Sequence, residues 1–142
     1  MVRVETFTAD EWRTLQFGPY WVFSAVLGAY KDFDPLEYEA FSNVLAQACA
    51  APGRLARQIV DSVLDEHAEL TRIYQTDERT IGRGLCAVAA VLRKAPADEA
   101  NLVKDMLIAH VGTGIARARG RFGRVISEDD QKTLELITQF LC

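Results

Sequence analysis

The stretch Lys31-Asp32-Phe33-Asp34-Pro35-Leu36-Glu37 predicts an acidic turn between two helices. Asp34 is a favourable N-cap residue, Pro35 fits the first helical position, and Glu37 completes a capping box. The helix that begins here is predicted to run to Ala48. Its apolar residues recur at helical spacing and should bury one face, formed by Leu36, Phe41, Val44, Leu45 and Ala48.

A capping box also begins the preceding helix, in the segment Phe7-Thr8-Ala9-Asp10-Glu11-Trp12. Thr8 and Glu11 form this box, and the aromatic residues at the two ends of the segment stand at the positions of a hydrophobic staple. Gly18-Pro19 is predicted to interrupt the helix, since proline lacks a backbone donor and crowds the preceding turn. An apolar run from Tyr20 to Tyr30 follows, so a kinked helix and two short helices both fit the pattern.

Four further helices are predicted downstream by apolar residues at three- and four-residue steps. They cover approximately Arg54–Tyr74, Asp77–Arg93, Pro96–Arg117 and the segment after Ser127. Asp77 is the expected cap of the second of these helices, and Ser127 is the expected cap of the last. No stretch shows the sustained alternation of a strand. The sequence therefore predicts an all-α bundle of six helices, or seven if Gly18-Pro19 separates two.

Two glycine-containing segments are predicted to let neighbouring helices approach closely. They are Gly82-Arg83-Gly84 and Gly112-Thr113-Gly114-Ile115-Ala116.

The tryptophans and Tyr20 belong either to the core or to an exposed apolar patch, and the pattern alone does not separate these two possibilities.

Length and composition indicate one ordinary globular domain over residues 1–142, with 49% hydrophobic and 25% charged residues. The net charge of −4 gives no general attraction to nucleic acid, so nucleic acid is not an expected partner. The three cysteines, Cys49, Cys86 and Cys142, are widely spaced and suit a reducing compartment. No signal pattern and no transmembrane run is evident, so a cytoplasmic protein is expected.

Two parts of the chain share one pattern, which is a small-residue helix end, a turn with one phenylalanine, and a capped amphipathic helix. The turns contain Phe33 and Phe122, respectively. This similarity indicates either a weak internal pseudo-two-fold duplication or only the pattern that many helix–turn–helix segments share. The first turn is acidic and the second is basic, so the two turns either neutralise each other or form opposite poles of the molecule.

The order of these features resembles the TerB-like tellurite-resistance family. The matching residues are Glu11-Trp12, Pro19, Gly28-Ala29, Asp32, Asp34 and Glu37, and Gly114 to Asp130 resembles the far end of such proteins. The resemblance is weak between about Ala50 and Arg93. It implies an all-α fold, an association with stress and tellurite resistance, and no established enzymatic reaction.

The resemblance also implies a divalent-cation site at the acidic turn, formed by Asp32, Asp34 and Glu37. Calcium and magnesium are the expected ions, because both prefer oxygen ligands. The family's turn usually contains Ala-Asp-Gly-x-Ile-Asp, whereas this chain has Lys31 and no glycine there. The alternative interpretation is purely structural, with Asp34 and Glu37 capping a helix and Asp32 in solvent. No other cofactor is expected.

Four arginines near the other end of the chain form a candidate anion site. They are Arg117, Arg119, Arg121 and Arg124. Guanidinium groups bind phosphate bidentately, and arginines beside Phe122 also suit a single-stranded base. The alternative is a charged loop in which two of the arginines interact with the negative end of a helix dipole.

His67 and His110 are the only candidate catalytic residues that the sequence suggests. With a carboxylate such as Asp61 or Asp105 they could form a metal-assisted hydrolytic site, and otherwise they are core residues. Motifs for nucleophilic catalysis and for phosphate or dinucleotide binding are absent, so we assign no catalytic residue. The sequence favours a non-enzymatic helical module with protein partners or self-association. A hydrolase and a phosphate or nucleic-acid binder are the alternatives.

Overall fold

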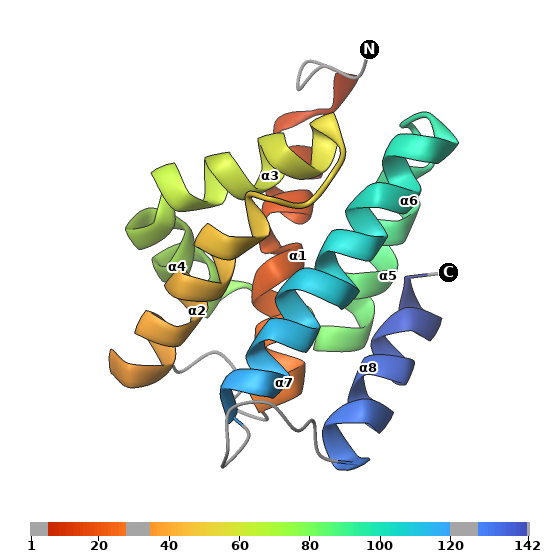
Figure 1. Ribbon diagram of the computed structural model, residues 1–142. Coiled ribbons are helices and arrows are strands. Elements are labelled where there is room, and N and C mark those ends of the chain that lie inside the picture. The colour runs from red at the N-terminus through yellow and green to blue at the C-terminus, as the bar shows by residue number, and fades with distance from the viewer. Residues whose placement is uncertain (1–5, 28–34, 120–127, 142) are drawn as a thin grey trace.

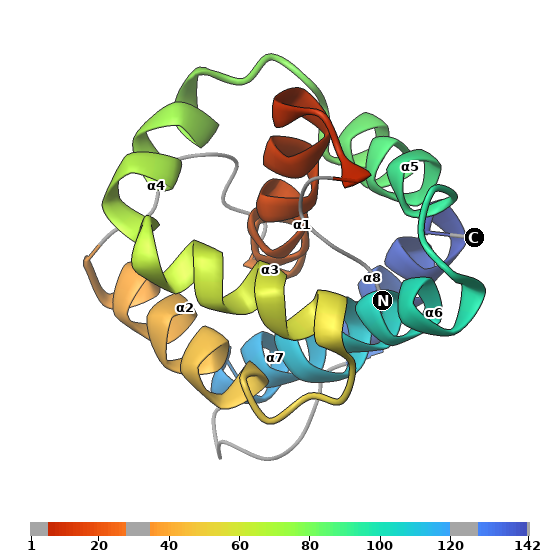
Figure 2. The same cartoon turned by 90° about the horizontal axis from the view of Figure 1, so that it is seen from above.

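Helix α1 (Ala9–Leu27) lies at the centre of the molecule, and the other helices surround it (Figure 1, Figure 2). The structure is a computed structural model that describes residues 6–27, 35–119 and 128–141. Every residue of α1 from Thr14 to Ser24 is buried. A helix that is buried on all sides is the core of its domain, and α1 accordingly contacts α3, α4, α5, α7 and α8.

The remaining elements are also helical. They are α2 (Pro35–Ala48), α3 (Arg54–Asp65), α4 (His67–Thr76), α5 (Ile81–Leu92), α6 (Ala97–Asp105), the π-helical segment η2 (Met106–Gly112), α7 (Thr113–Arg119) and α8 (Glu128–Phe140). Since α6, η2 and α7 follow one another without a break, the described ranges contain seven helices and no strand. The predicted all-α bundle is confirmed. No described helix is long and apolar enough to cross a bilayer.

The predicted start of the first helix is confirmed in detail. The backbone N–H of Thr8 donates to Glu11 Oε1 at 2.9 Å, and the N–H of Glu11 donates to Thr8 Oγ1 at 3.1 Å. The rings of Phe7 and Trp12 stack with centroids 6.3 Å apart, as a hydrophobic staple requires. The caps of α2 and α8 were predicted at Asp34 and Ser127, which lie outside the described residues.

The predicted interruption at Gly18-Pro19 is wrong, because α1 continues through Pro19 as a single helix. Both residues are buried, and a Cβ at Gly18 would lie only 3.3 Å from Leu107 of η2. We attribute the continuity to this close packing, which offsets the hydrogen bond that proline cannot donate. The ambiguity about the large aromatic residues is also resolved, because Tyr20 and Trp21 are fully buried and Trp12 is half-buried.

The predicted single helix over Arg54–Tyr74 is divided at Glu66 into α3 and α4. The Glu66 carboxylate accepts a hydrogen bond from Gln16 Nε2 of α1 at 2.8 Å. The same nitrogen donates to Ser62 Oγ at 3.2 Å, so one buried glutamine binds both the last turn of α3 and the residue at the break. No glycine or proline marks this position, so the break depends on tertiary contacts that the local pattern does not reveal.

Two smaller predictions are also corrected. Leu36 is 77% exposed and does not belong to the buried face of α2, since it stands on the outer side of the first turn. Asp77 does not cap α5, because its carboxylate binds Arg79. The cap is Thr80, whose side chain accepts from the N–H of Arg83 at 3.2 Å.

The two small-residue segments do permit close helix packing. A Cβ at Gly112 would lie 2.6 Å from Leu134 of α8, and a Cβ at Gly114 would lie 3.0 Å from Val44 of α2. The prediction for Gly82-Arg83-Gly84 is confirmed at Gly84, where a Cβ would overlap the indole of Trp21. These contacts bring α2, α5 and α8 against the central part of the bundle.

Candidate binding surface

An open groove runs between α5 and the end of α8, and we call it the α5–α8 groove. Its volume is about 820 Å³. It is lined by Arg79, Thr80, Gly82, Arg83, Cys86, Ala87 and Phe140. Much of this lining is apolar or small, and Cys86, Arg83 and Phe140 are exposed. Such a groove is suited to an apolar side chain of a binding partner.

Gly82 and Phe140 form the floor of the α5–α8 groove. A Cβ at Gly82 would lie 3.1 Å from Cζ of Phe140, so the aromatic ring rests directly on the α5 backbone. The ring is nevertheless 39% exposed, because it stands near the end of α8 and is covered from one side only. A large exposed aromatic side chain in a groove is a frequent feature of interaction sites.

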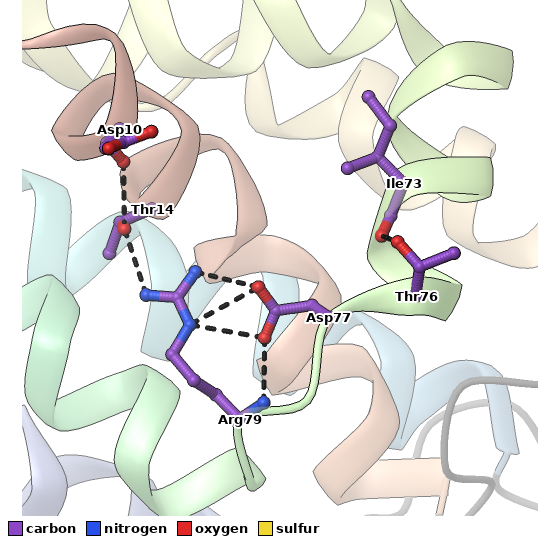
Figure 3. Close-up of polar contacts among 6 residues, drawn as sticks. All are labelled: Asp10, Thr14, Ile73, Thr76, Asp77 and Arg79. Carbon is purple, nitrogen blue, oxygen red and sulfur yellow. Dashed lines mark hydrogen bonds and ion pairs between the residues drawn. The ribbon is translucent and has the colours of Figure 1, made fainter.

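Arg79 is one of the residues that line the groove. It also binds the α4–α5 connection to α1 (Figure 3). Its Nη2 donates to Asp77 Oδ2 at 2.9 Å, and its Nη1 donates to Thr14 Oγ1 at 3.1 Å. Thr14 in turn donates to the carbonyl oxygen of Asp10 at 3.0 Å. The guanidinium also lies 4.9 Å from the ring centroid of Trp21, within range of a cation–π interaction.

A second depression lies on the other side of Arg79. It has a volume of about 550 Å³ and lies where α1 meets α4 and the α4–α5 connection. Its lining is more polar and includes Asp10, Arg13, Thr14, Ile73 and Asp77. Arg79 therefore separates an apolar groove from a polar depression, and its many contacts hold its side chain in place.

The predicted cation ligands are described only in part. Glu37 lies in the first turn of α2 and is half-buried, whereas Asp32 and Asp34 lie outside the described residues. Within residues 6–27, 35–119 and 128–141, no group of three His, Cys, Asp or Glu side chains is placed to hold a metal ion.

The predicted arginine cluster lies largely beyond the description as well. Arg117 is exposed on α7. Arg119 is the last residue of that helix, and Arg121 and Arg124 lie outside the described residues. Both predicted charged sites therefore stay predictions. The helices that flank them do approach one another, since α1 contacts both α7 and α8, and α2 contacts α7.

The two histidines have different surroundings. His67 begins α4 and packs in an aromatic cluster, with ring centroids 4.4 Å from Tyr38 and 5.7 Å from Phe41. Burial lowers the pKa of His67 below its usual value of 6.5. His110 lies half-buried on η2. In the part of the chain that the structure describes, these imidazoles and a carboxylate do not form a three-ligand metal site.

The described cysteines differ in their accessibility. Cys86 is exposed in the α5–α8 groove, whereas Cys49 is half-buried between α2 and α3. Cys49 Sγ lies 3.7 Å from Asp61 Oδ1. Burial, together with this carboxylate, raises the pKa of the Cys49 thiol. Cys86 is therefore the more accessible of the two cysteines in the described residues.

No protein-family model, no curated protein and no solved structure matches this chain. The resemblance to TerB-like proteins therefore stays a prediction. The sequence pattern predicts close packing at Gly82 but does not reveal the α5–α8 groove. The missing information was the position of Phe140, which contacts a glycine that is fifty-eight positions earlier in the chain.

Proposed function

We propose that this protein is a non-enzymatic helical interaction module that holds an apolar segment of a partner in the α5–α8 groove. The observation that supports this function is the exposed ring of Phe140 on the floor of a groove whose other lining residues are small or cationic. An exposed apolar depression with polar residues at its edge is typical of a protein-binding site.

The TerB-like identity, the association with stress or tellurite resistance and a cytoplasmic location belong to the same proposal. Six described helices around the apolar helix α1 are compatible with such a module. A divalent cation at Asp32, Asp34 and Glu37 is the accessory ligand that we expect. The position of Glu37 in the first turn of α2 is compatible with that site.

A peptide-selection experiment tests the proposed function. Phage-displayed random peptides of about four helical turns, long enough to span the groove, would be selected against the immobilised full chain. Peptides that bind are expected to contain apolar anchors and to lose binding when Cys86→Glu places a charged side chain in the groove.

Ala46→Glu provides the matched control, because Ala46 is also an exposed helical position but lies on α2, away from the groove. Selected peptides should bind this variant as tightly as they bind the unmodified chain. The proposed function is contradicted if no peptide is enriched, or if the enriched peptides bind Cys86→Glu and Ala46→Glu equally.

A further inference from the structure

The side of α8 that borders the groove has two protruding apolar side chains. Leu136 is 52% exposed and Phe140 is 39% exposed. They are four residues apart and therefore lie on one face of the helix. Because Phe140 rests on Gly82, this face is the one that borders α5. Two large apolar side chains exposed next to each other on one face form a contiguous apolar patch, and such patches indicate interaction sites.

The outer face of α5, together with the residues that flank this helix, is basic rather than apolar. The segment from Arg79 to Lys94 contains four basic residues and no acidic residue. Arg79 binds Asp77, and Lys94 binds Glu11 at 2.7 Å. Arg83 and Arg93 are exposed and have no ion pair among the described residues. Between them the exposed positions are the small residues Cys86 and Ala90, which leave room for another helix.

The exposed charges of α8 have the opposite sign. Glu128, Asp129 and Glu135 are exposed, and Lys132 is the one basic residue of the helix. The molecule therefore presents, side by side, a basic helix with small side chains and an acidic helix with large apolar side chains. Helices α5 and α8 contact each other, so both belong to one continuous surface.

This surface is complementary to itself. In a two-fold dimer each contact occurs twice, so α5 of one copy can face α8 of the other at both places. Arg83 and Arg93 would then oppose the carboxylates of the second copy, and Leu136 would lie against the small residues between those arginines. A partner with the charge pattern of α8 is needed, and a second copy of this chain supplies it.

We propose that the face formed by α5 and α8 binds a second copy of this chain. This inference rests on the proposed function and specifies its partner. The contact involves one pair of helices per copy, so we expect a reversible dimer whose population depends on protein concentration rather than an obligate one. Exposed charge pairs are screened by salt, so the dimer should weaken as ionic strength rises.

Charge reversal tests this arrangement through sedimentation equilibrium of the full chain. Arg83→Glu with Arg93→Glu makes α5 acidic, and Asp129→Lys with Glu135→Lys makes α8 basic. Each double variant alone should be monomeric at concentrations where the unmodified chain dimerises, because like charges then meet at both contacts. An equimolar mixture of the two variants should dimerise again, since both contacts of the mixed dimer pair opposite charges.

A control variant reverses exposed charges on another face, with Arg57→Glu and Asp65→Lys on α3. It should dimerise as the unmodified chain does, and thermal melting should show that all variants are folded. The inference is overturned if the unmodified chain is monomeric at every concentration. A dimer that persists in both charge-reversed variants, or that the mixture fails to restore, overturns it as well.

The outcome also separates this inference from the proposed function. A monomeric chain whose groove binds selected peptides would retain the interaction module and exclude the second copy as its partner. A dimer that follows the charge reversals, together with no enriched peptide, would contradict a groove that holds peptide segments and would leave self-association as the only binding by this face.

Discussion

Helix α5 has two glycines that each lie beneath an aromatic ring, and the two contacts differ in almost every other respect. Gly84 lies under Trp21, which is fully buried in α1. Gly82 lies under Phe140, which is 39% exposed on α8. One side of α5 is therefore sealed against the central helix, and the other side ends in the open α5–α8 groove.

One short helix, α5, therefore packs into the core on one side and lines an exposed groove on the other. The Trp21 ring is held on all sides and cannot move away from Gly84, because the core around it is densely packed. The Phe140 ring has solvent on one side and can shift toward it. Dense packing therefore requires a glycine at position 84. At position 82 a glycine mainly determines the form of the groove surface, because the ring above it is partly exposed.

The largest effect is expected from Gly84→Ala. The new methyl group would overlap the Trp21 indole, and a dense core accommodates added volume only by displacing side chains and backbone. We expect a loss of about 3 kcal/mol or more in the free energy of unfolding, measured by chemical denaturation. An unchanged denaturation midpoint would show that Gly84 and Trp21 are not tightly packed at the α1–α5 contact.

Arg79→Ala tests whether the contacts that Arg79 makes with α1 stabilise the fold. The side chains of Arg79 and Asp77 are 34% and 16% exposed, and Arg79 also contacts Thr14 and Trp21. We expect a loss of about 1–2 kcal/mol on chemical denaturation.

Arg72→Ala is the matched comparison for Arg79→Ala. Arg72 pairs with Glu69 at 2.6 Å, but their side chains are 68% and 59% exposed. Its loss should cost less than about 0.5 kcal/mol, because water screens such a pair. Equal losses in the two variants would mean that burial of the Arg79 contacts contributes nothing.

Gly82→Ala is expected to have a small effect on stability. The new Cβ would approach Phe140 to 3.1 Å, and the exposed ring can move by the few tenths of an ångström that are needed. Alanine also favours the helix, so the free energy of unfolding should change by less than about 1 kcal/mol in either direction. A loss as large as that of Gly84→Ala would remove the distinction between the sealed and open sides.

The smallest expected effect concerns the pH dependence of the free energy of unfolding that arises from His67. Because burial lowers its folded-state pKa below 6.5, the unfolded chain binds more protons than the folded chain as pH falls through that value. The stability contribution is therefore present above the unfolded-state pKa and is lost as the pH decreases.

His67→Phe keeps a ring beside Tyr38 and Phe41 but cannot be protonated. Between about pH 7.5 and about pH 5.5, its free energy of unfolding should fall less than that of the unmodified chain, by under about 1 kcal/mol. Parallel pH profiles of the two proteins would contradict the assignment of this dependence to His67.

The sequence predicted those parts of the fold that depend on neighbouring residues. The capping box of Thr8 and Glu11 closes within one helical turn, and the apolar spacing of α2 identifies Phe41, Val44 and Leu45 as core residues. These interactions need no information about distant parts of the chain. The all-α class follows from the same local periodicity.

The parts that the sequence did not predict depend on contacts between distant elements. Pro19 stays within a helix because the core packs around it, and the break at Glu66 accompanies a hydrogen bond from Gln16. The α5–α8 groove likewise requires the ring of Phe140 to stand on Gly82. Local propensity is a weak guide where tertiary packing outweighs it.

The exposed thiol of Cys86 allows the most direct test of the proposed binding surface. Its alkylation rate would be followed by mass spectrometry as the concentration of the full chain is raised, with Cys49 as the half-buried internal reference. If this groove binds a second copy, Cys86 should become progressively protected while the rate at Cys49 stays constant. An alkylation rate at Cys86 that is independent of concentration would contradict the assignment of this groove as the surface that binds a second copy.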